Sequence, residues 1–191
     1  GVRSHAGAVP PRTGQYRWAR AAHRSWGLPR RSTAGGASLN GEGLKHQDRQ
    51  AMRMALTTPA GVAYDPVFGY EIAFIVEEGL RRMYGPDSHG PENNVFYYLT
   101  VYNEPYPQPP MPEISRLREG VLKGIYRYSH VPGDQPRAQV LASGISVRLA
   151  LEAPRLLRDD GRPAAAVWHV KTGVALRRGA GRPPQHSLLN P

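Results

Sequence analysis

An amphipathic pattern that leads into an aromatic run constrains the fold of this chain most strongly. In residues 66–83 the apolar side chains recur at steps of three and four residues, and they are Phe68, Ile72, Ile75, Val76, Leu80 and Met83. This spacing predicts a helix with one buried stripe. Asp65 and Pro66 stand where an N-cap and a first helical residue are favoured, and Gly85 followed by Pro86 predicts the end of the helix.

Two apolar runs flank this predicted helix. Residues 95–102 (VFYYLTVY) have the β-branched and aromatic composition of a strand, and residues 60–64 predict a shorter buried strand before the helix. A helix between buried strands favours an α/β layer. Residues 103–112 (NEPYPQPPMP) then predict an extended path, because each proline fixes its own φ and biases the preceding residue away from helix.

A second α/β pattern follows in the rest of the chain. Residues 113–128 predict a short helix and then the segment GIYRY, while residues 138–145 (AQVLASGI) and 164–170 (AAAVWHV) predict strands. The stretch 146–160 between these strands predicts a helix that Pro154 kinks or breaks. A strand–helix–strand order predicts a parallel pair with a right-handed crossover.

The charge of the chain raises a different interpretation, a basic nucleic-acid-binding module. The chain has 191 residues, a formal net charge of +10 and no cysteine. The basic excess is concentrated at the two ends, and basic and aromatic residues alternate only within residues 16–24. No apolar run approaches the ~20 residues that cross a bilayer, and the Arg-rich start lacks a secretory signal pattern. We therefore expect neither a nucleic-acid nor a membrane partner.

Three runs carry a resemblance to a known family. They are LNGEGLKHQD (residues 39–48), VAYDPVFGYEIAFIVEEGLRRMYG (residues 62–85) and ENNVFYYLTVYNEPYPQPPMPE (residues 92–113). They closely resemble the homodimeric bacterial pyruvate dehydrogenase first component, which is thiamine-diphosphate dependent and acetyl-transferring. The resemblance implies an α/β chain with a partial thiamine-diphosphate-binding, transketolase-like fold. We expect a mainly parallel sheet flanked by helices, with irregular ends rich in Arg, Gly and Pro.

The resemblance also implies a domain organisation. Residues 1–31 have no lasting period and are an unassigned basic tail. Residues 32–112 match the C-terminal part of the pyrimidine-binding domain, and residues 113–191 match the N-terminal part of the transketolase-like C-terminal domain.

Two candidate site residues lie in the first run. The resemblance implies that His46 helps to bind the substrate-derived intermediate at the active-site mouth, and that Glu42 lies near the subunit contact. Gly41 and Gly43 permit the close backbone approach that such a loop needs. An imidazole can donate to an oxyanion or move a proton near neutral pH, although a single His beside a Gly-rich turn is more often an exposed loop residue.

Three further residues are candidates for a substrate pocket or a subunit interface. Asn40 precedes the Gly-rich run, and Asn103 and Glu104 follow the carboxyl end of a predicted strand, where α/β sheets usually place ligands. At the next positions after Asp48 relatives usually have Gly and a second His, where this chain has Arg49 and Gln50. Both differences put turnover in doubt.

The cofactor signature of the family is absent from this chain. Relatives carry Gly-Asp-Gly with a downstream Asn for Mg²⁺, and Gly133-Asp134-Gln135 and Asp159-Asp160-Gly161 are not equivalents. The glutamate that contacts the aminopyrimidine belongs to sequence that would precede residue 1. We therefore expect the chain alone to bind neither thiamine diphosphate nor Mg²⁺, and we assign it no cofactor-binding residue and no metal ligand.

The resemblance implies a fragment or degenerate copy of pyruvate dehydrogenase, an oxidoreductase that is catalytically incomplete as an isolated chain. The parent enzyme decarboxylates pyruvate and reductively acetylates lipoyl groups, and so links glycolysis to acetyl-CoA. The implied partners are pyruvate, a second copy or an intact subunit as a dimer, and the lipoyl acyltransferase core, all in the cytoplasm. Two alternatives remain open: the basic nucleic-acid-binding module and a non-catalytic dimerising paralogue.

Overall fold

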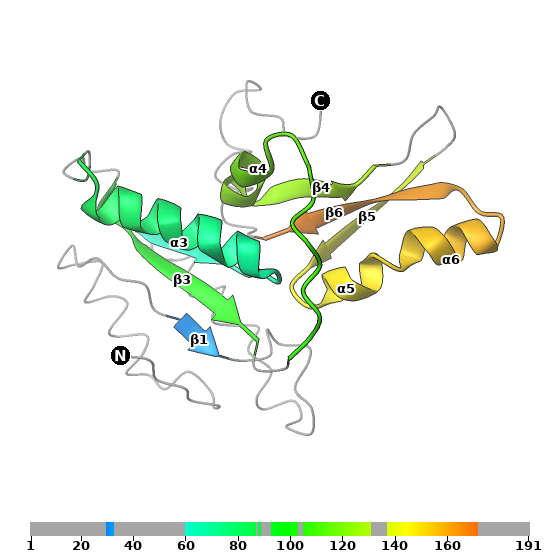
Figure 1. Cartoon of the computed structure of the whole chain (residues 1–191), viewed down its shortest axis with the longest axis horizontal. Helices are drawn as coiled ribbons and strands as arrows, with labels where there is room; N and C mark the ends of the chain where they lie inside the picture. The colour runs from blue at the N-terminus through cyan, green and yellow to red at the C-terminus, as the bar shows by residue number, and fades with distance from the viewer. Residues whose placement is uncertain are drawn as a thin grey trace. The chain divides into compact units, whose positions relative to one another are not determined.

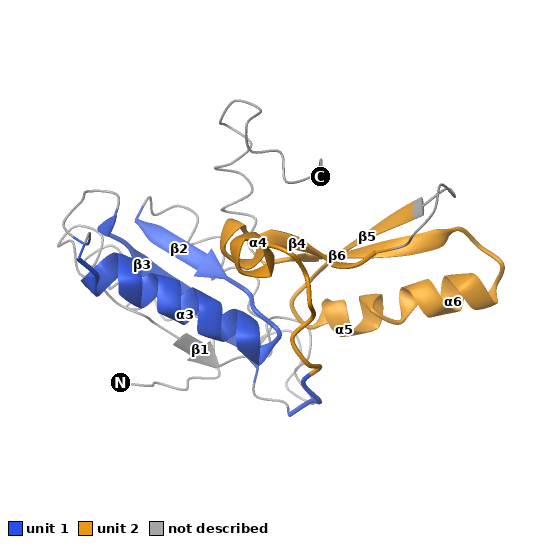
Figure 2. Ribbon diagram, turned by 45° about the horizontal axis from the view of Figure 1, so that its top comes forward, with its two compact units in different colours: residues 1–108 blue, residues 109–191 orange. Residues whose placement is uncertain are grey.

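The computed structural model describes residues 30–32, 60–86, 88, 93–102, 105–130 and 137–171. The chain divides into two units, Gly1–Gln108 and Pro109–Pro191, which Figure 2 colours separately. Each unit is built on its own small sheet, and each is described by itself below.

Unit 1 is organised around a buried central strand, β3 (Phe96–Val101). It pairs in parallel with β2 (Gly61–Tyr64) on one side and with β1 (Arg30–Ser32) on the other, in the order β1-β3-β2. Figure 1 shows α3 (Gly69–Tyr84) running along this sheet. The structure confirms the two predicted strands and the predicted helix between them.

Strand β1 lies at the end of the predicted basic tail, residues 1–31, and includes the first residue after it. Its three residues, Arg30–Ser32, pair with β3 in the register Arg30 opposite Leu99 and Ser32 opposite Val101. A strand this short and polar has no β-sheet pattern of its own. Backbone pairing with the apolar β3 explains why composition missed it.

The start of α3 differs from the prediction. The helix begins at Gly69, and Phe68 precedes it in extended conformation, so Asp65 is not the N-cap. The carboxylate that accepts from the backbone amides before the helix belongs to Glu71. Its Oε2 accepts from Val67 N (2.9 Å) and Phe68 N (3.1 Å). The helix ends as predicted, and the N–H of Gly85 donates to the carbonyl of Arg81 at 2.8 Å.

The buried face of α3 also departs from the predicted stripe. Glu71, Ile75, Gly79 and Met83 are the buried helical residues, whereas Leu80 is 46% exposed. A Cβ at position 79 would lie 3.4 Å from ring atoms of Tyr97. This distance is ordinary van der Waals contact, so α3 packs against Tyr97 of β3 at position 79 and not at Leu80.

Unit 2 contains a mixed sheet with the order β4-β6-β5. Helix α4 (Leu117–Lys123) leads through Gly124, at φ 98°, into β4 (Ile125–Ser129). Strands β5 (Arg137–Ser143) and β6 (Ala164–Val170) are parallel, as predicted, while β4 runs antiparallel to β6. Three of the four strand pairs in the described chain are thus parallel, which confirms the mainly parallel α/β fold class.

The predicted helix between β5 and β6 is two short helices. They are α5 (Ser146–Ala150) and α6 (Ala153–Asp159), and Pro154 lies in the first turn of α6. The break that Pro154 predicted is confirmed, because proline is tolerated at the start of a helix and not in its interior. Neither these helices nor the others in the described residues are long and apolar enough to cross a membrane.

Candidate functional site

The site residues predicted from the sequence lie outside the described part of the chain. They are Asn40, Glu42, His46, Asn103 and Glu104, and Arg49 and Gln50 are outside it as well. Their roles therefore stay predictions. The described chain reaches both neighbours of the last pair, Tyr102 and Pro105, at the carboxyl end of β3.

A hollow of about 270 Å³ lies at this end of the sheet. It is lined by residues from the start of α3, from the end of β3 and from the segment that follows, including Pro66, Ile72, Tyr102, Tyr106 and Gln108. Strands β2 and β3 are parallel, so their carboxyl ends meet at the same edge. Parallel α/β sheets commonly bind ligands at that edge.

Asp65 joins the two strand ends beside this hollow. Its Oδ1 accepts hydrogen bonds from the hydroxyl of Thr100 and, at 2.8 Å, from the hydroxyl of Tyr102. Thr100 is only 3% exposed. The carboxylate therefore fixes the end of β2 against the end of β3, directly before Asn103 in the chain.

The chain's own groups also occupy the N-terminus of α3. Gln108 Oε1 accepts from the N–H of Gly69 at 3.0 Å, and the hydroxyl of Tyr106 donates to the carbonyl of Val67. Glu71, whose side chain is fully buried, accepts from the amides of Val67 and Phe68. The segment after β3 is therefore fastened to the helix start as far as Gln108, the last residue of unit 1.

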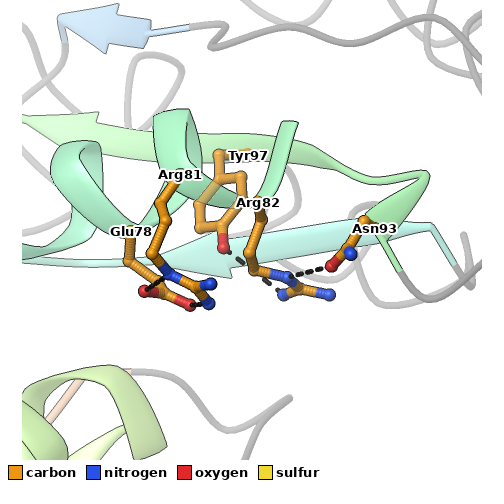
Figure 3. A network of polar contacts seen from close by, with 5 residues as sticks. All are labelled: Glu78, Arg81, Arg82, Asn93 and Tyr97. Atoms are coloured by element: carbon orange, nitrogen blue, oxygen red, sulfur yellow. Dashed lines mark hydrogen bonds and ion pairs between the residues drawn. The ribbon is translucent and has the colours of Figure 1, made fainter. Parts of the chain in front are cut away.

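A second polar network connects the other end of α3 to β3 (Figure 3). The guanidinium of Arg82 donates to the hydroxyl of Tyr97 at 3.3 Å and to Asn93 Oδ1 at 3.5 Å, while Arg81 and Glu78 form an ion pair at 2.7 Å. Burial raises the pKa of Tyr97, and the nearby Arg82 opposes this effect. Burial likewise raises the pKa of Tyr64, whose ring stacks on that of Tyr97 with centroids 6.2 Å apart.

Unit 2 encloses an uncommon pair of basic side chains. His169 and Lys171 are both fully buried, and Lys171 Nζ lies 2.8 Å from His169 Nδ1. The same ammonium lies 5.0 Å from the ring centroid of Tyr126, in cation–π range. In the described residues no group of three His, Cys, Asp or Glu side chains has the geometry to hold a metal ion.

Sequence reasoning missed the polar residues that build these junctions. Thr100 and Tyr102 alternate at the end of a strand, so they face the same side and can share one partner. That alternation was the available signal, but Asp65 could be recognised as the partner only from the pairing of β2 with β3. Glu71 carries a weaker signal, an acid three residues after the residue that precedes the helix.

The fold defines the class of protein to which the chain belongs. A transketolase from Campylobacter jejuni subsp. jejuni matches with a TM-score of 0.59 at 16% identity, over 86% of this chain and 24% of that chain. A transketolase from Pichia stipitis matches with a TM-score of 0.57 at 20% identity, over 85% of this chain and 22% of that one. This likeness shows a transketolase-like α/β fold.

Sequence relatives narrow this class to one family. A family model described as the pyruvate dehydrogenase E1 component middle domain matches residues 8–109. The chain therefore belongs to the pyruvate dehydrogenase E1 component family, the enzyme family that the sequence resemblance indicated. The matched range begins within the N-terminal basic segment and ends next to the boundary between the two units.

Three curated relatives carry the name pyruvate dehydrogenase E1 component. That of Mycolicibacterium smegmatis is 47% identical over 181 residues, which is 94% of this chain and 19% of the relative. That of Mycobacterium tuberculosis is 50% identical over 169 residues (87% and 18%), and that of Escherichia coli K12 is 36% identical over 180 residues (94% and 20%). The chain thus spans about a fifth of the length of these relatives. The matches give no support to a nucleic-acid-binding module.

Proposed function

We propose that the chain forms one portion of a thiamine-diphosphate-dependent pyruvate dehydrogenase. It contributes the C-terminal part of the pyrimidine-binding domain (residues 32–112) and the N-terminal part of a transketolase-like C-terminal domain (residues 113–191). The middle-domain match over residues 8–109 carries this proposal. The whole enzyme decarboxylates pyruvate and reductively acetylates lipoyl groups, which links glycolysis to acetyl-CoA in the cytoplasm.

The proposed reaction requires a cofactor and a metal ion. Thiamine diphosphate supplies the carbon nucleophile that attacks the carbonyl of pyruvate, and Mg²⁺ holds its diphosphate. Among the described residues no group of three His, Cys, Asp or Glu side chains has the geometry to hold Mg²⁺. We therefore assign none of them to the cofactor.

The chain's own contribution lies around the carboxyl edge of the β1-β3-β2 sheet. His46 donates a hydrogen bond to an oxygen of the substrate, while Glu42, Asn40, Asn103 and Glu104 form the pocket wall or the subunit contact. Tyr102 precedes Asn103 in the chain, and its hydroxyl donates to Asp65 at 2.8 Å at the carboxyl end of β3, which supports this proposal. The proposed partners are pyruvate, a second copy or intact subunit, and the lipoyl acyltransferase core.

We expect the isolated chain to be inactive. Purified chain supplied with pyruvate, thiamine diphosphate and Mg²⁺ releases no CO₂ above the protein-free background. Robust, cofactor-dependent release would show that the chain is not an incomplete portion. A chimera tests the positive side: this chain's sequence replaces the matching segment of the M. smegmatis enzyme, which is 47% identical.

Substitutions in that chimera test the roles of single residues. His46→Ala lowers kcat about 10²- to 10⁴-fold, because it removes a group that donates to or exchanges protons with the reacting oxygen. His89→Ala, in the polar stretch between Gly85 and Val95 to which no site role is assigned, serves as the matched histidine control and leaves kcat within about twofold. The double change Arg49→Gly and Gln50→His raises kcat at least about tenfold. An unchanged kcat for the His46 variant would remove that residue from the site.

A further inference from the structure

Unit 2 contains a hollow to which the proposed function assigns no role. It has a volume of about 410 Å³ and lies between the end of β4, the start of β6 and the α5–α6 segment. All of its lining residues belong to unit 2 and to the described chain. The volume is within the lower part of the range of small-molecule sites, roughly 300–1,000 Å³.

Part of the lining of the hollow is apolar. Leu151 and Pro154 line it from the α5–α6 segment, and Ala164 and Ala165 line it from the start of β6. None of these side chains can donate or accept a hydrogen bond. These four residues therefore suit the hydrocarbon or aromatic part of a ligand.

The rest of the lining is cationic and rich in donors. Arg158, Arg162 and His130 line it, together with the hydroxyl-bearing Tyr128 and Ser129, and the lining includes no aspartate or glutamate. A guanidinium binds phosphate oxygens through two parallel N–H groups, which makes arginine the preferred residue for such groups. Two guanidiniums can balance the two charges of a phosphate monoester.

The arginines on and just after α6 differ in their ion pairs. Arg155 pairs with Asp159 at 3.2 Å and does not line the hollow. Arg158 has no ion-pair partner in the described part of the chain, and Arg162 Nε lies 3.9 Å from Asp160 Oδ2 in a pair whose side chains are 67% and 70% exposed. Of the two arginines that line the hollow, Arg158 therefore has no ion pair among the described residues, and Arg162 has only a long, exposed one.

We propose that this hollow binds a small phosphate monoester with an apolar body. Its phosphate contacts Arg158 and Arg162, and its apolar body packs on Leu151, Pro154 and Ala164. The reaction at the sheet edge of unit 1 neither requires nor supplies this ligand. The hollow is therefore a second binding site of the chain, and its test does not depend on the proposed function.

Phenyl phosphate is the probe that tests both the phosphate contact and the apolar contact. We expect calorimetric titration of the full chain to detect phenyl phosphate, and to give an affinity at least about tenfold weaker for inorganic phosphate and for phenol. Binding weakens as salt rises, because exposed charges are screened. Equal affinity for phenol would overturn the phosphate contact, and equal affinity for inorganic phosphate would overturn the apolar contact.

Two arginine variants distinguish this hollow from a general charge effect. The double variant Arg158→Gln and Arg162→Gln weakens phenyl phosphate binding at least about tenfold, since it removes both guanidiniums. The matched control Arg155→Gln carries the same kind of change on the same helix and leaves the affinity within about twofold. An equal loss in both variants, or no loss in the double variant, would overturn the proposal.

A measurement on the unaltered chain makes the test independent of variant folding. In an NMR titration with phenyl phosphate, the methyl groups of Leu151 and the amides of Ala164 and Ala165 shift with one common dissociation constant. The methyl groups of Leu80, on α3 in unit 1, do not shift. Shifts at Leu80 that match those at Leu151 would indicate non-specific binding and would overturn the proposal.

Discussion

Glu71 places a carboxylate in the interior of unit 1, where it accepts from the amides of Val67 and Phe68. Glu71→Ala leaves both amides without this partner, at a cost of about 1–3 kcal/mol for each buried group. We expect the free energy of unfolding to fall by about 2–4 kcal/mol, measured by urea unfolding followed by circular dichroism. Glu71→Gln retains one accepting oxygen and costs less.

The exposed neighbour Glu77 provides the control for this substitution. Glu77→Ala changes the same helix by the same chemistry on its outer face, so we expect the free energy of unfolding to stay within about 0.5 kcal/mol. Equal losses for Glu71→Ala and Glu77→Ala would show that general helix charge, and not the two amides, accounts for the effect.

The buried tyrosines Tyr64 and Tyr97 predict a loss of stability at alkaline pH. Burial raises the pKa of both hydroxyls in the folded chain. Above the ordinary value of about 10, the unfolded chain therefore releases these protons while the folded chain keeps them, and stability present below pH 10 is lost as pH rises. Each tyrosine contributes a slope of up to about 1.4 kcal/mol per pH unit.

Tyr64→Phe tests this linkage. We expect the plot of unfolding free energy against pH above 10 to become less steep by the contribution of one tyrosine, as measured by urea unfolding at several pH values. An unchanged slope for the Tyr64 variant would contradict the prediction.

At the scale of elements, two glycines mark opposite kinds of packing. A Cβ at Gly79 of α3 would make ordinary contact with the Tyr97 ring at 3.4 Å, so Gly79→Ala gains helix propensity and changes stability by 0 to about +1 kcal/mol. A Cβ at Gly120 of α4 would lie 2.7 Å from Tyr126 Cβ and 3.1 Å from the Ile125 carbonyl. Gly120→Ala therefore destabilises unit 2 by about 1–3 kcal/mol. Urea unfolding measures the free energy of unfolding of both variants. Stability changes of the same sign for Gly79→Ala and Gly120→Ala would contradict this prediction.

The elements that could be predicted are those whose own residues carry the pattern. Strands β2, β3 and β6 are mainly apolar runs bounded by polar or turn residues, β5 (RAQVLAS) has an apolar centre, and Pro154 alone predicts the break between α5 and α6. Strand β1 and the antiparallel direction of β4 depend on partners distant in the chain, which periodicity does not encode.

The candidate site was less predictable than the elements for the same reason. In the register of β2 and β3, Tyr64 lies opposite Leu99, which brings the next residue, Asp65, to Thr100. A cap assignment for Asp65 followed local rules, and a long-range hydrogen-bond network overrode them. The predictions for His46 and Glu42 came from family resemblance, and these two residues lie outside the described chain.

At the scale of the whole molecule, the two units meet in the chain at Gln108 and Pro109. The segment after β3 is held to unit 1 through Tyr106 and Gln108, and residues 109–114 form neither helix nor strand. Two units, each with its own sheet and joined by an extended proline-rich segment, are expected to unfold as separate cooperative parts.

Cleavage by a glutamate-specific protease tests this organisation. Glu113 is exposed in the extended segment, whereas Glu77 and Glu119 lie in helices α3 and α4, which must open locally before cleavage. We expect mass spectrometry to show cleavage at Glu113 at least about tenfold faster than at either helical site, with the helical circular dichroism signal retained. Glu113→Gln removes this site and abolishes the early cleavage. Earlier cleavage at Glu77 or Glu119 would show that the helices open more readily than the segment between the units.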